Sequence, residues 1–411
     1  MNASILKQTG FLPFLATRVF AMLAIQIQSV IVGWHVYDAT RNPMALAYVG
    51  LSQFVPMAAC LPIAGDIADR YNRKWVLGIG LAVACVCSLM LMGIMLAGKD
   101  YVYWAYAVLM IFGAARSFIN PVLQSLLPQI VPRESLPQSI ATNSALIKLA
   151  TILGPVAGGV LYSISSHYAY LACSASFLLA IVPLFWVTLR YAHKLDPSDT
   201  FRLGKVWARF LEGGRFITSK PIILGAMLLD LLAVLLGGVV ALLPIYASDV
   251  LHVGAQGLGL LRSSIAVGEI AAGVYLARFP IRRSVGKLMF ASVALFGLAN
   301  LVFALSTSFW LSLAALALTG LFDMISVNIR SSLIQLATPD AMRGRVTAVN
   351  MLFITSSNEL GEFRAGLSAR WLGVVPTAVL GSLFSLGVVL VMMQKFPSLR
   401  MADTFADAEE K

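Results

Sequence analysis

Twelve apolar runs of about 20 residues each, separated by polar stretches, constrain what this chain can fold into. A helix needs about 20 apolar residues to cross the hydrocarbon core of a bilayer, and it satisfies its own backbone hydrogen bonds there. No run alternates in polarity like a strand of a membrane barrel. The sequence therefore predicts an all-α integral membrane protein, in keeping with its 59% hydrophobic residues. The predicted spans are residues 12–38, 44–64, 75–97, 101–123, 139–163, 168–189, 222–246, 257–277, 287–305, 309–336, 347–369 and 374–394.

Lysine and arginine are distributed unevenly over the predicted loops, and this distribution predicts the orientation. With a cytoplasmic amino terminus, the internal loops hold 17 basic residues (3, 1, 7, 4 and 2 in chain order, with Lys287 at the start of span 9 counted in its loop), whereas the outer loops hold only Arg41, Lys99 and Arg370. We therefore expect a multi-pass protein of the cytoplasmic (inner) membrane of a bacterium, with both termini in the cytoplasm. The net charge of +11 then reflects topology and contact with membrane lipid, and not nucleic-acid binding.

The longest interruption, from Arg190 to Lys220, divides the spans into six and six. Within it, Leu203 to Ile217 places apolar and basic side chains on opposite faces, which is typical of a helix on the membrane surface, although a plain linker explains the segment equally well. The predicted domains are an N-terminal six-helix bundle (1–189), a cytoplasmic linker with an amphipathic helix (190–220), a C-terminal six-helix bundle (221–395) and a cytoplasmic tail (396–411).

The two halves carry a weak internal repeat at an offset of 207 residues. It aligns the end of span 4, the following inner loop and the start of span 5 with the same regions of spans 10 and 11. Two parallel repeats of this kind are the organisation of a rocking transporter whose substrate site lies between the halves. The matched residues are Gly113, Ser125, Leu126, Pro132, Ala141 and Asn143 in the first half, and Gly320, Ser332, Leu333, Pro339, Ala348 and Asn350 in the second.

The loop between spans 2 and 3, "GDIADRYNRK", is dense in charge for a chain with only 12% charged residues. It resembles the signature loop of the major facilitator superfamily, which reads Gly, three residues, Asp-Arg, one residue, Gly-Arg-Lys. Asn72 stands where that family usually has glycine, and we expect it to occupy a left-handed turn, which Asn tolerates best among non-glycine residues. The matching residues are Gly65, Asp69, Arg70, Arg73 and Lys74.

This resemblance implies a twelve-helix fold of two pseudo-symmetric bundles and a gating role for the loop. Asp69 is expected near the amino-terminal end of span 11, where it meets the positive end of the helix dipole. Arg70 and Arg73 are expected to pair with acids on the cytoplasmic face and so to hold the inner gate shut. The alternative is that the basic residues only anchor the loop inside.

Span 5, "ALIKLATILGPVAGG", resembles the end of the antiporter motif of the same superfamily at Gly154, Pro155, Gly158 and Gly159. This favours export, although small residues at such spacings also serve close helix packing. The segments "PRESLPQSIATNS", "TPDAMRGRV" and "NELGEFRAG" are similar to the branch of the superfamily that contains enterobactin exporters and macrolide efflux proteins. Resemblance to that superfamily also implies a monomer.

Charged residues inside the spans predict a cavity that is basic in the first half and acidic in the second, because intramembrane charges face a partner or a cavity. Glu359 and Glu362 share a helical face, so one of them is expected to hold a proton, although Arg364 is an alternative neutralising partner. The predicted cavity residues are Arg18, Gln26, Arg116, Asn120, Asn143, Lys148 and Arg262. The candidates for proton coupling are Asp230, Glu269, Asp323, Glu359 and Glu362.

No motif of an enzyme or an ATP-driven pump accompanies these features. The chain has no phosphate-binding loop and no metal motif, and its four histidines, His35, His167, His193 and His252, are scattered, so we predict no cofactor and no metal. The prediction is a proton-coupled exporter of a medium-sized metabolite such as a siderophore, working by alternating access. The alternatives are efflux of macrolides or other drugs and, more distantly, a membrane scaffold without transport. The expected partners are the small-molecule substrate, protons and membrane lipid.

Overall fold

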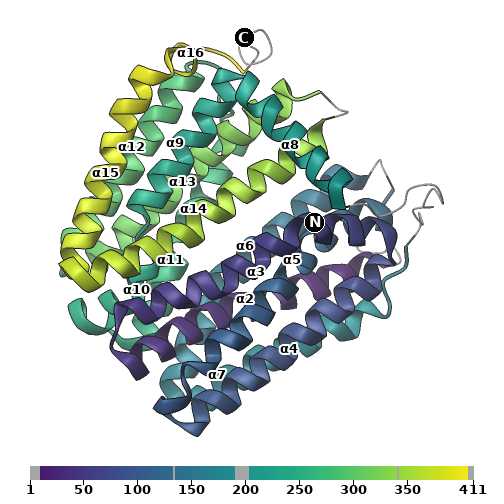
Figure 1. Cartoon of the computed structure of the whole chain (residues 1–411), viewed down its shortest axis with the longest axis vertical. Coiled ribbons are helices and arrows are strands. Elements are labelled where there is room, and N and C mark those ends of the chain that lie inside the picture. Colours follow the sequence, from purple (N-terminus) through teal and green to yellow (C-terminus); the bar gives the residue numbers. More distant parts are fainter. Residues whose placement is uncertain (1–9, 133–134, 190–202, 340–341, 406–411) are drawn as a thin grey trace. The chain divides into compact units, whose positions relative to one another are not determined.

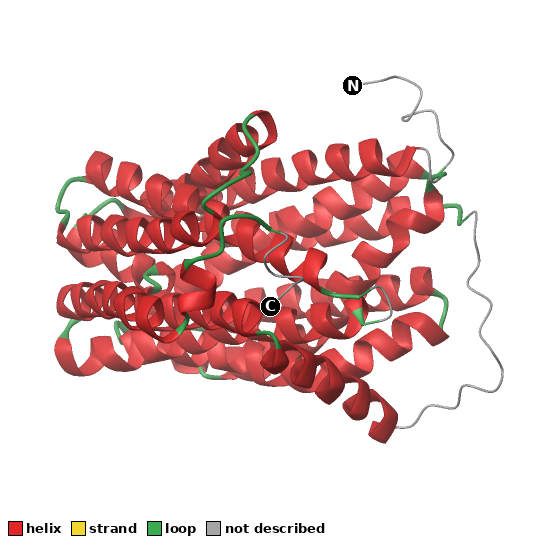
Figure 2. Ribbon diagram, turned by 90° about the horizontal axis from the view of Figure 1, so that it is seen from above, coloured by secondary structure: helices red, strands yellow, loops and turns green. Residues whose placement is uncertain are grey.

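A computed structural model describes residues 10–132, 135–189, 203–339 and 342–405, and these residues form helices and loops with no strand (Figures 1 and 2). The first six long helices are α2 (Phe11–Thr40), α3 (Pro43–Arg70), α4 (Arg73–Ala97), α5 (Trp104–Ile130), α6 (Leu136–Ile164) and α7 (Ser166–Leu184), with a short turn η1 (Lys99–Tyr101) before α5. After α8 (Leu203–Ser219) come α9 (Pro221–Gly237), η3 (Val240–Leu242), α10 (Leu243–Ile245), η4 (Tyr246–Val250), α11 (Gly254–Arg278), α12 (Val285–Leu305), α13 (Phe309–Ala337), α14 (Arg343–Leu372), α15 (Val374–Lys395) and α16 (Pro397–Arg400).

Among the described residues, eleven helical segments are long and apolar enough to cross a membrane. The predicted span 347–369 lies in α14, which has the length of a span but is not among the eleven. Glu359, Glu362 and Arg364 fall close together in this helix and lower its hydropathy. A long helix with this many charges needs polar partners if it is to lie within a bilayer.

The chain separates into two compact units. Unit 1 comprises Met1–Thr40, Ser52–Val206 and Gly254–Gly259, and unit 2 comprises Arg41–Leu51, Trp207–Val253 and Leu260–Lys411. The start of α3 thus groups with unit 2, and the start of α11 groups with unit 1. The domain boundaries at residues 189 and 220 stay a prediction, and α8 covers the segment for which the sequence predicts a surface helix.

The same five helix pairs recur in the two units. In unit 1, α2 packs on α6 and α7, α4 packs on α5 and α7, and α6 packs on α7. In unit 2, α9 packs on α14 and α15, α12 packs on α13 and α15, and α14 packs on α15. If α2 and α9 are each taken as the first long helix of their half, every pair in unit 1 has its counterpart in unit 2. This recurrence confirms the predicted fold of two pseudo-symmetric bundles.

Two glycines matched by the 207-residue offset occupy equivalent close contacts. A Cβ atom at Gly113 of α5 would overlap the backbone of Gln53 in α3, and one at Gly320 of α13 would overlap the backbone of Ile265 in α11. Only a residue without a side chain lets the two backbones approach so closely. The repeat therefore extends from helix order to individual contacts.

The predicted span 222–246 lies within Pro221–Val250, one of the eleven apolar segments, but it is not a single continuous α-helix. Helix α9 ends at Gly237, and Gly238 is extended (φ −61°, ψ 127°) before the chain continues as η3, α10 and the π-helical turn η4. Two consecutive glycines are poor helix formers, and Pro244 in the first turn of α10 has no N–H to donate. The buried hydroxyl of Tyr246 holds the broken segment by donating to a backbone carbonyl of α12 at 2.9 Å.

Candidate functional site

The signature loop joins α3 to α4, and its residues fall on both sides of the junction. Gly65, Asp69 and Arg70 lie in the last turns of α3, but their side chains are outside the described residues, so the gating contact expected of Asp69 stays a prediction. Arg73 donates from Nη1 to the carbonyl of Ser125 in α5 at 3.2 Å. This contact ties the start of α4 to a neighbouring helix of the same unit.

Lys74 makes a second tie at the same end of α4. Its Nζ donates to the carbonyls of Val187 at 2.6 Å and Phe185 at 3.4 Å, directly after the end of α7. A lysine in this position satisfies carbonyls that have no partner within the helix. Arg73 and Lys74 thus have a structural role within unit 1 in addition to any role in gating.

Asn72 does not take the left-handed conformation expected of it. It is the N-cap of α4, with φ −61° and ψ 112°, and its Oδ1 accepts a hydrogen bond from the backbone N–H of Lys74 at 3.0 Å. Asn is among the best N-cap residues because its side chain satisfies an N–H that the helix leaves free. Capping explains the residue where glycine would offer only flexibility.

The glycines of the antiporter-like motif lie where α6 approaches α2 and the start of α11 closely. A Cβ atom at Gly154 would come within 2.5 Å of the Cβ of Gln26 in α2, and one at Gly158 within 3.2 Å of a backbone oxygen of α2. A Cβ at Gly159 would overlap the backbone of Ala255, and one at Gly259 would overlap the backbone of α6 at Pro155. Packing alone accounts for these small residues, so the preference for export stays a prediction.

The basic cavity residues predicted in the first half lie on three helices of unit 1. Arg18 of α2 donates to the carbonyl of Leu123 in α5 at 2.7 Å. Arg116 of α5 donates to Oε1 of Gln53 at 3.2 Å, and Lys148 is half-buried on α6. Both arginines are thus oriented by neighbours, as charges within a membrane require.

The two asparagines predicted with them differ in environment. Asn143 is 5% exposed, and its Oδ1 has no hydrogen-bond partner among the described residues. Asn120 is exposed. The repeat mate of Asn143 is Asn350, whose Oδ1 is likewise buried and has no partner within the described part of the chain. A cavity that gathers all seven predicted residues stays a prediction.

A buried ion pair joins α9 to α13 in unit 2. Asp230 and Arg330 are 6% and 3% exposed, and the carboxylate Oδ2 contacts the guanidinium Nη1 directly. The sequence indicated both charges but not their pairing, because they are 100 positions apart. Asp230 is the only charged residue of α9, and a lone charge in an apolar helix is a signal that a partner exists.

A second charged cluster of unit 2 lies on α14. The carboxylates of Glu359 and Glu362 both lie beside Gly50 of α3. A Cβ atom added at Gly50 would be 3.4 Å from Oε2 of Glu362 and 3.5 Å from Oε2 of Glu359, so the two oxygens are no more than 6.9 Å apart. The guanidinium of Arg262 in α11 lies within electrostatic reach of both carboxylates. Arg364, the alternative partner, donates from Nε to the carbonyl of Leu235 in α9 at 2.9 Å.

The remaining predicted acids, Glu269 on α11 and Asp323 on α13, are half-buried. They lie on helices that meet at the close contact of Gly320 with Ile265. Both helices belong to unit 2 at these positions. All five acids proposed for proton coupling are therefore in one unit.

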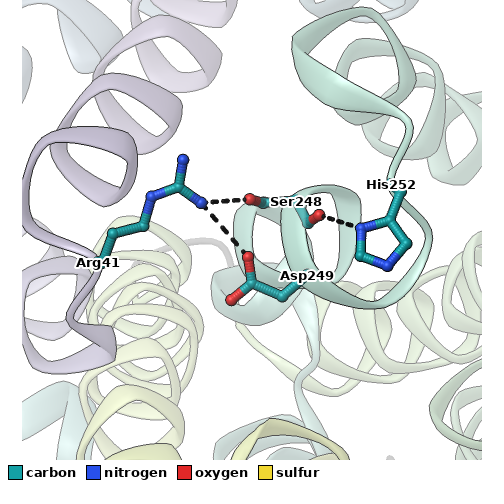
Figure 3. Close-up of polar contacts among 4 residues, drawn as sticks. All are labelled: Arg41, Ser248, Asp249 and His252. Carbon is teal, nitrogen blue, oxygen red and sulfur yellow. Dashed lines mark hydrogen bonds and ion pairs between the residues drawn. The ribbon is translucent and has the colours of Figure 1, made fainter.

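A polar cluster that the sequence did not indicate is built around the loop before α3 (Figure 3). Arg41 donates from Nη1 to Oγ of Ser248 at 2.8 Å and pairs with Oδ1 of Asp249 at 3.5 Å. The carbonyl of Ser248 lies 2.9 Å from Nδ1 of His252, and Arg41 and His252 have positive φ angles of 49° and 53°. The sequence identified Arg41 only as an outer-loop charge, whereas the structure shows that it holds the π-helical turn η4.

A family model described as the Major Facilitator Superfamily matches residues 14–361 of the chain. The chain belongs to the major facilitator superfamily. It is 27% identical over 409 residues to the enterobactin exporter EntS of Citrobacter koseri, covering 95% of this chain and 92% of that protein. It is 25% identical over 412 residues to EntS of Escherichia coli O1:K1, covering 96% and 94%.

Solved structures agree at the level of the fold. A bacterial homologue of the iron transporter ferroportin, in an inward-facing state, superposes with a TM-score of 0.69 at 18% identity and covers 95% of this chain and 98% of its own. The sequence-based resemblance to the superfamily and to its enterobactin-exporter branch is thus confirmed. The chain is a multi-pass membrane transporter of a small molecule.

Proposed function

We propose that this transporter is a proton-coupled exporter of a siderophore-like, hydroxyl-rich or anionic metabolite, working by alternating access. The observation that carries the proposal is the similarity to enterobactin exporters over nearly the whole chain. The arginines of unit 1 support it, because Arg18 and Arg116 are oriented, positively charged groups in membrane-spanning helices. Guanidinium groups suit the carboxylate and catecholate oxygens of such a ligand.

Glu359 and Glu362 are the best-supported carriers of the coupled proton. The Oε2 atoms of these two side chains are at most 6.9 Å apart, and two carboxylates this close in a membrane-spanning helix favour binding of a proton by one of them. Asp230 differs, because its pair with Arg330 is already neutral and a proton there would leave a buried cation without its partner. Glu269 and Asp323 remain the other candidates for carrying the coupled proton.

Macrolide or multidrug efflux is the second candidate, and the carboxylates of unit 2 favour it. A cationic amine on a drug would find the carboxylates of Glu359 and Glu362 close together in α14. In that case the drug and the proton would compete for the same charges. The substrate classes therefore predict opposite dependences on the two units.

Transport into inverted vesicles with each substrate class separates the two candidates. Vesicles with the protein should accumulate an iron-free catecholate siderophore and not a radiolabelled macrolide, and Arg116→Gln should lower siderophore uptake. Accumulation of the macrolide alone would support the second candidate. Uptake of neither, from vesicles in which the protein is folded and abundant, would contradict both.

A further inference from the structure

A cluster of titratable side chains at one end of unit 1 is not among the predicted coupling residues. It contains His35 and Asp38 of α2, Tyr162 of α6 and Tyr170 of α7, on three helices that all pack against one another. The ring of His35 meets that of Tyr162 edge to face, with centroids 5.6 Å apart and planes at 77°. The Tyr170 ring lies 6.0 Å away at 49°.

Two polar atoms of this cluster are buried without a hydrogen-bond partner among the described residues. They are Nδ1 of His35 and the hydroxyl of Tyr170, whose side chain is fully buried. Buried polar atoms are nearly always paired, and an exception in a membrane-spanning helix points to a functional role. Packing alone would be served as well by phenylalanine at either position.

A carboxylate lies beside the imidazole. Asp38 is three residues after His35 in the same helix, hence on the same face, and it is within electrostatic reach of both His35 and Tyr162. Helix α2 ends at Thr40, so Asp38 lies in its last turn and is half-buried. This turn is on the outer side in the predicted topology, from which a driving proton would enter.

We propose that His35, assisted by Asp38 and the rings of Tyr162 and Tyr170, forms a proton-binding site in unit 1. An incoming proton from external water binds the free ring nitrogen of neutral His35, and the same proton later leaves to internal water. The aromatic rings are at the distance at which a cation is attracted to a ring face. Histidine is the side chain whose charge changes most readily between about pH 5 and 8.

Other titratable groups also belong to α2 and to the helices that pack on it. Helix α2 itself adds Arg18 and Tyr37. The others are Tyr106 and Arg116 of α5, Lys148 of α6, His167, Tyr168 and Cys173 of α7, and Cys85, Cys87, Arg73 and Lys74 of α4. The basic side chains Arg18, Arg73, Lys74 and Arg116 already donate hydrogen bonds within unit 1, as given above. The thiol of Cys173 donates to the carbonyl of Ala24 and to Oε1 of Gln28. Asp38 is the only acid in α2, α4, α5, α6 and α7.

This proposal rests on proton coupling, and its test keeps the two separable. In protein labelled with 15N-histidine, each of the four histidines gives a ring signal, and His35→Gln identifies the one from His35. We expect that signal to titrate between about pH 5 and 8 and to respond to added 2,3-dihydroxybenzoate. A His35 signal that is unchanged over this range would overturn the proposal, whatever the transport assays show.

Transport supplies the second readout. In proteoliposomes, the transport rate of the wild type should change with pH by up to about tenfold per pH unit on one side of its pH profile, as expected for a single proton-binding group. In His35→Gln this pH dependence should be lost. His167→Gln is the matched control, because this histidine is exposed and its ring hydrogen-bonds to the hydroxyl of Ser165. An unchanged pH profile in His35→Gln overturns the proposal. A wild type that moves no protons refutes proton coupling instead, and the titration still judges the site.

Discussion

Replacing Asp230 with Asn tests whether this acid is a structural partner or a proton carrier. The substitution keeps the volume and removes the charge, so Arg330 stays buried, at 3% exposure, without its counter-ion. Breaking a buried pair in this way costs about 3–5 kcal/mol, because the remaining charge is uncompensated. We expect a loss of this size in the free energy of unfolding, measured by SDS titration in mixed micelles.

The double variant completes the test. If the cost of Asp230→Asn comes from the stranded cation, adding Arg330→Met should recover part of it, with a coupling energy of at least about 1 kcal/mol. Glu212→Gln is the control, because Glu212 pairs with Arg345 at 2.6 Å at an exposed position, where a pair is worth only about 0–1 kcal/mol. Additive effects of the two core substitutions, or normal stability of Asp230→Asn with abolished proton movement, would refute the structural reading.

Five further substitutions test the gate, the repeat and the polar cluster. Asp69→Asn should slow turnover while leaving insertion and ligand binding unchanged, and a normal rate would reduce the signature loop to a topological anchor. Gly113→Leu and Gly320→Leu should each destabilise by about 1–3 kcal/mol, because both force backbones apart, and thermal unfolding in detergent should show similar losses for the two. Because Arg41 and Asp249 are exposed, Arg41→Ala and Asp249→Ala should each change the free energy of unfolding by less than about 1 kcal/mol. Their effects on the transport rate should be non-additive in the double variant, and additive effects would argue against a functional pair.

Apolar length predicted most of the fold, because the bilayer restricts a spanning segment to a helix of nearly fixed length. The predicted run 287–305, for instance, coincides with α12, Val285–Leu305, to within two residues. The prediction failed where local backbone chemistry competes with hydropathy. Gly237 and Gly238 interrupt an apolar run without lowering its hydropathy, and Asn72 caps a helix instead of turning left-handed.

The sequence predicted which charged residues lie within the membrane spans, but not which of them contact one another. The sequence placed Asp230 and Arg330 in the membrane, yet only the packing of α9 on α13 brings them together. His35 gave no signal at all, because its neighbours come from three helices and share no sequence motif. Which side chains of two helices meet depends on how each helix is rotated about its own axis. In a helix that is apolar all round, the hydropathy pattern does not determine this rotation.

Proton movement driven by a substrate gradient is the direct measure of proton-coupled export. Purified protein in proteoliposomes containing pyranine should change the internal pH when an iron-free catecholate siderophore is added outside, and a collapsed pH gradient should abolish accumulation of the siderophore. Glu359→Gln combined with Glu362→Gln should retain binding of the siderophore but lose the pH change. Siderophore transport at a normal rate with no pH change in the wild type would contradict proton coupling. An unaltered pH change in the double variant would contradict the role of Glu359 and Glu362 in it.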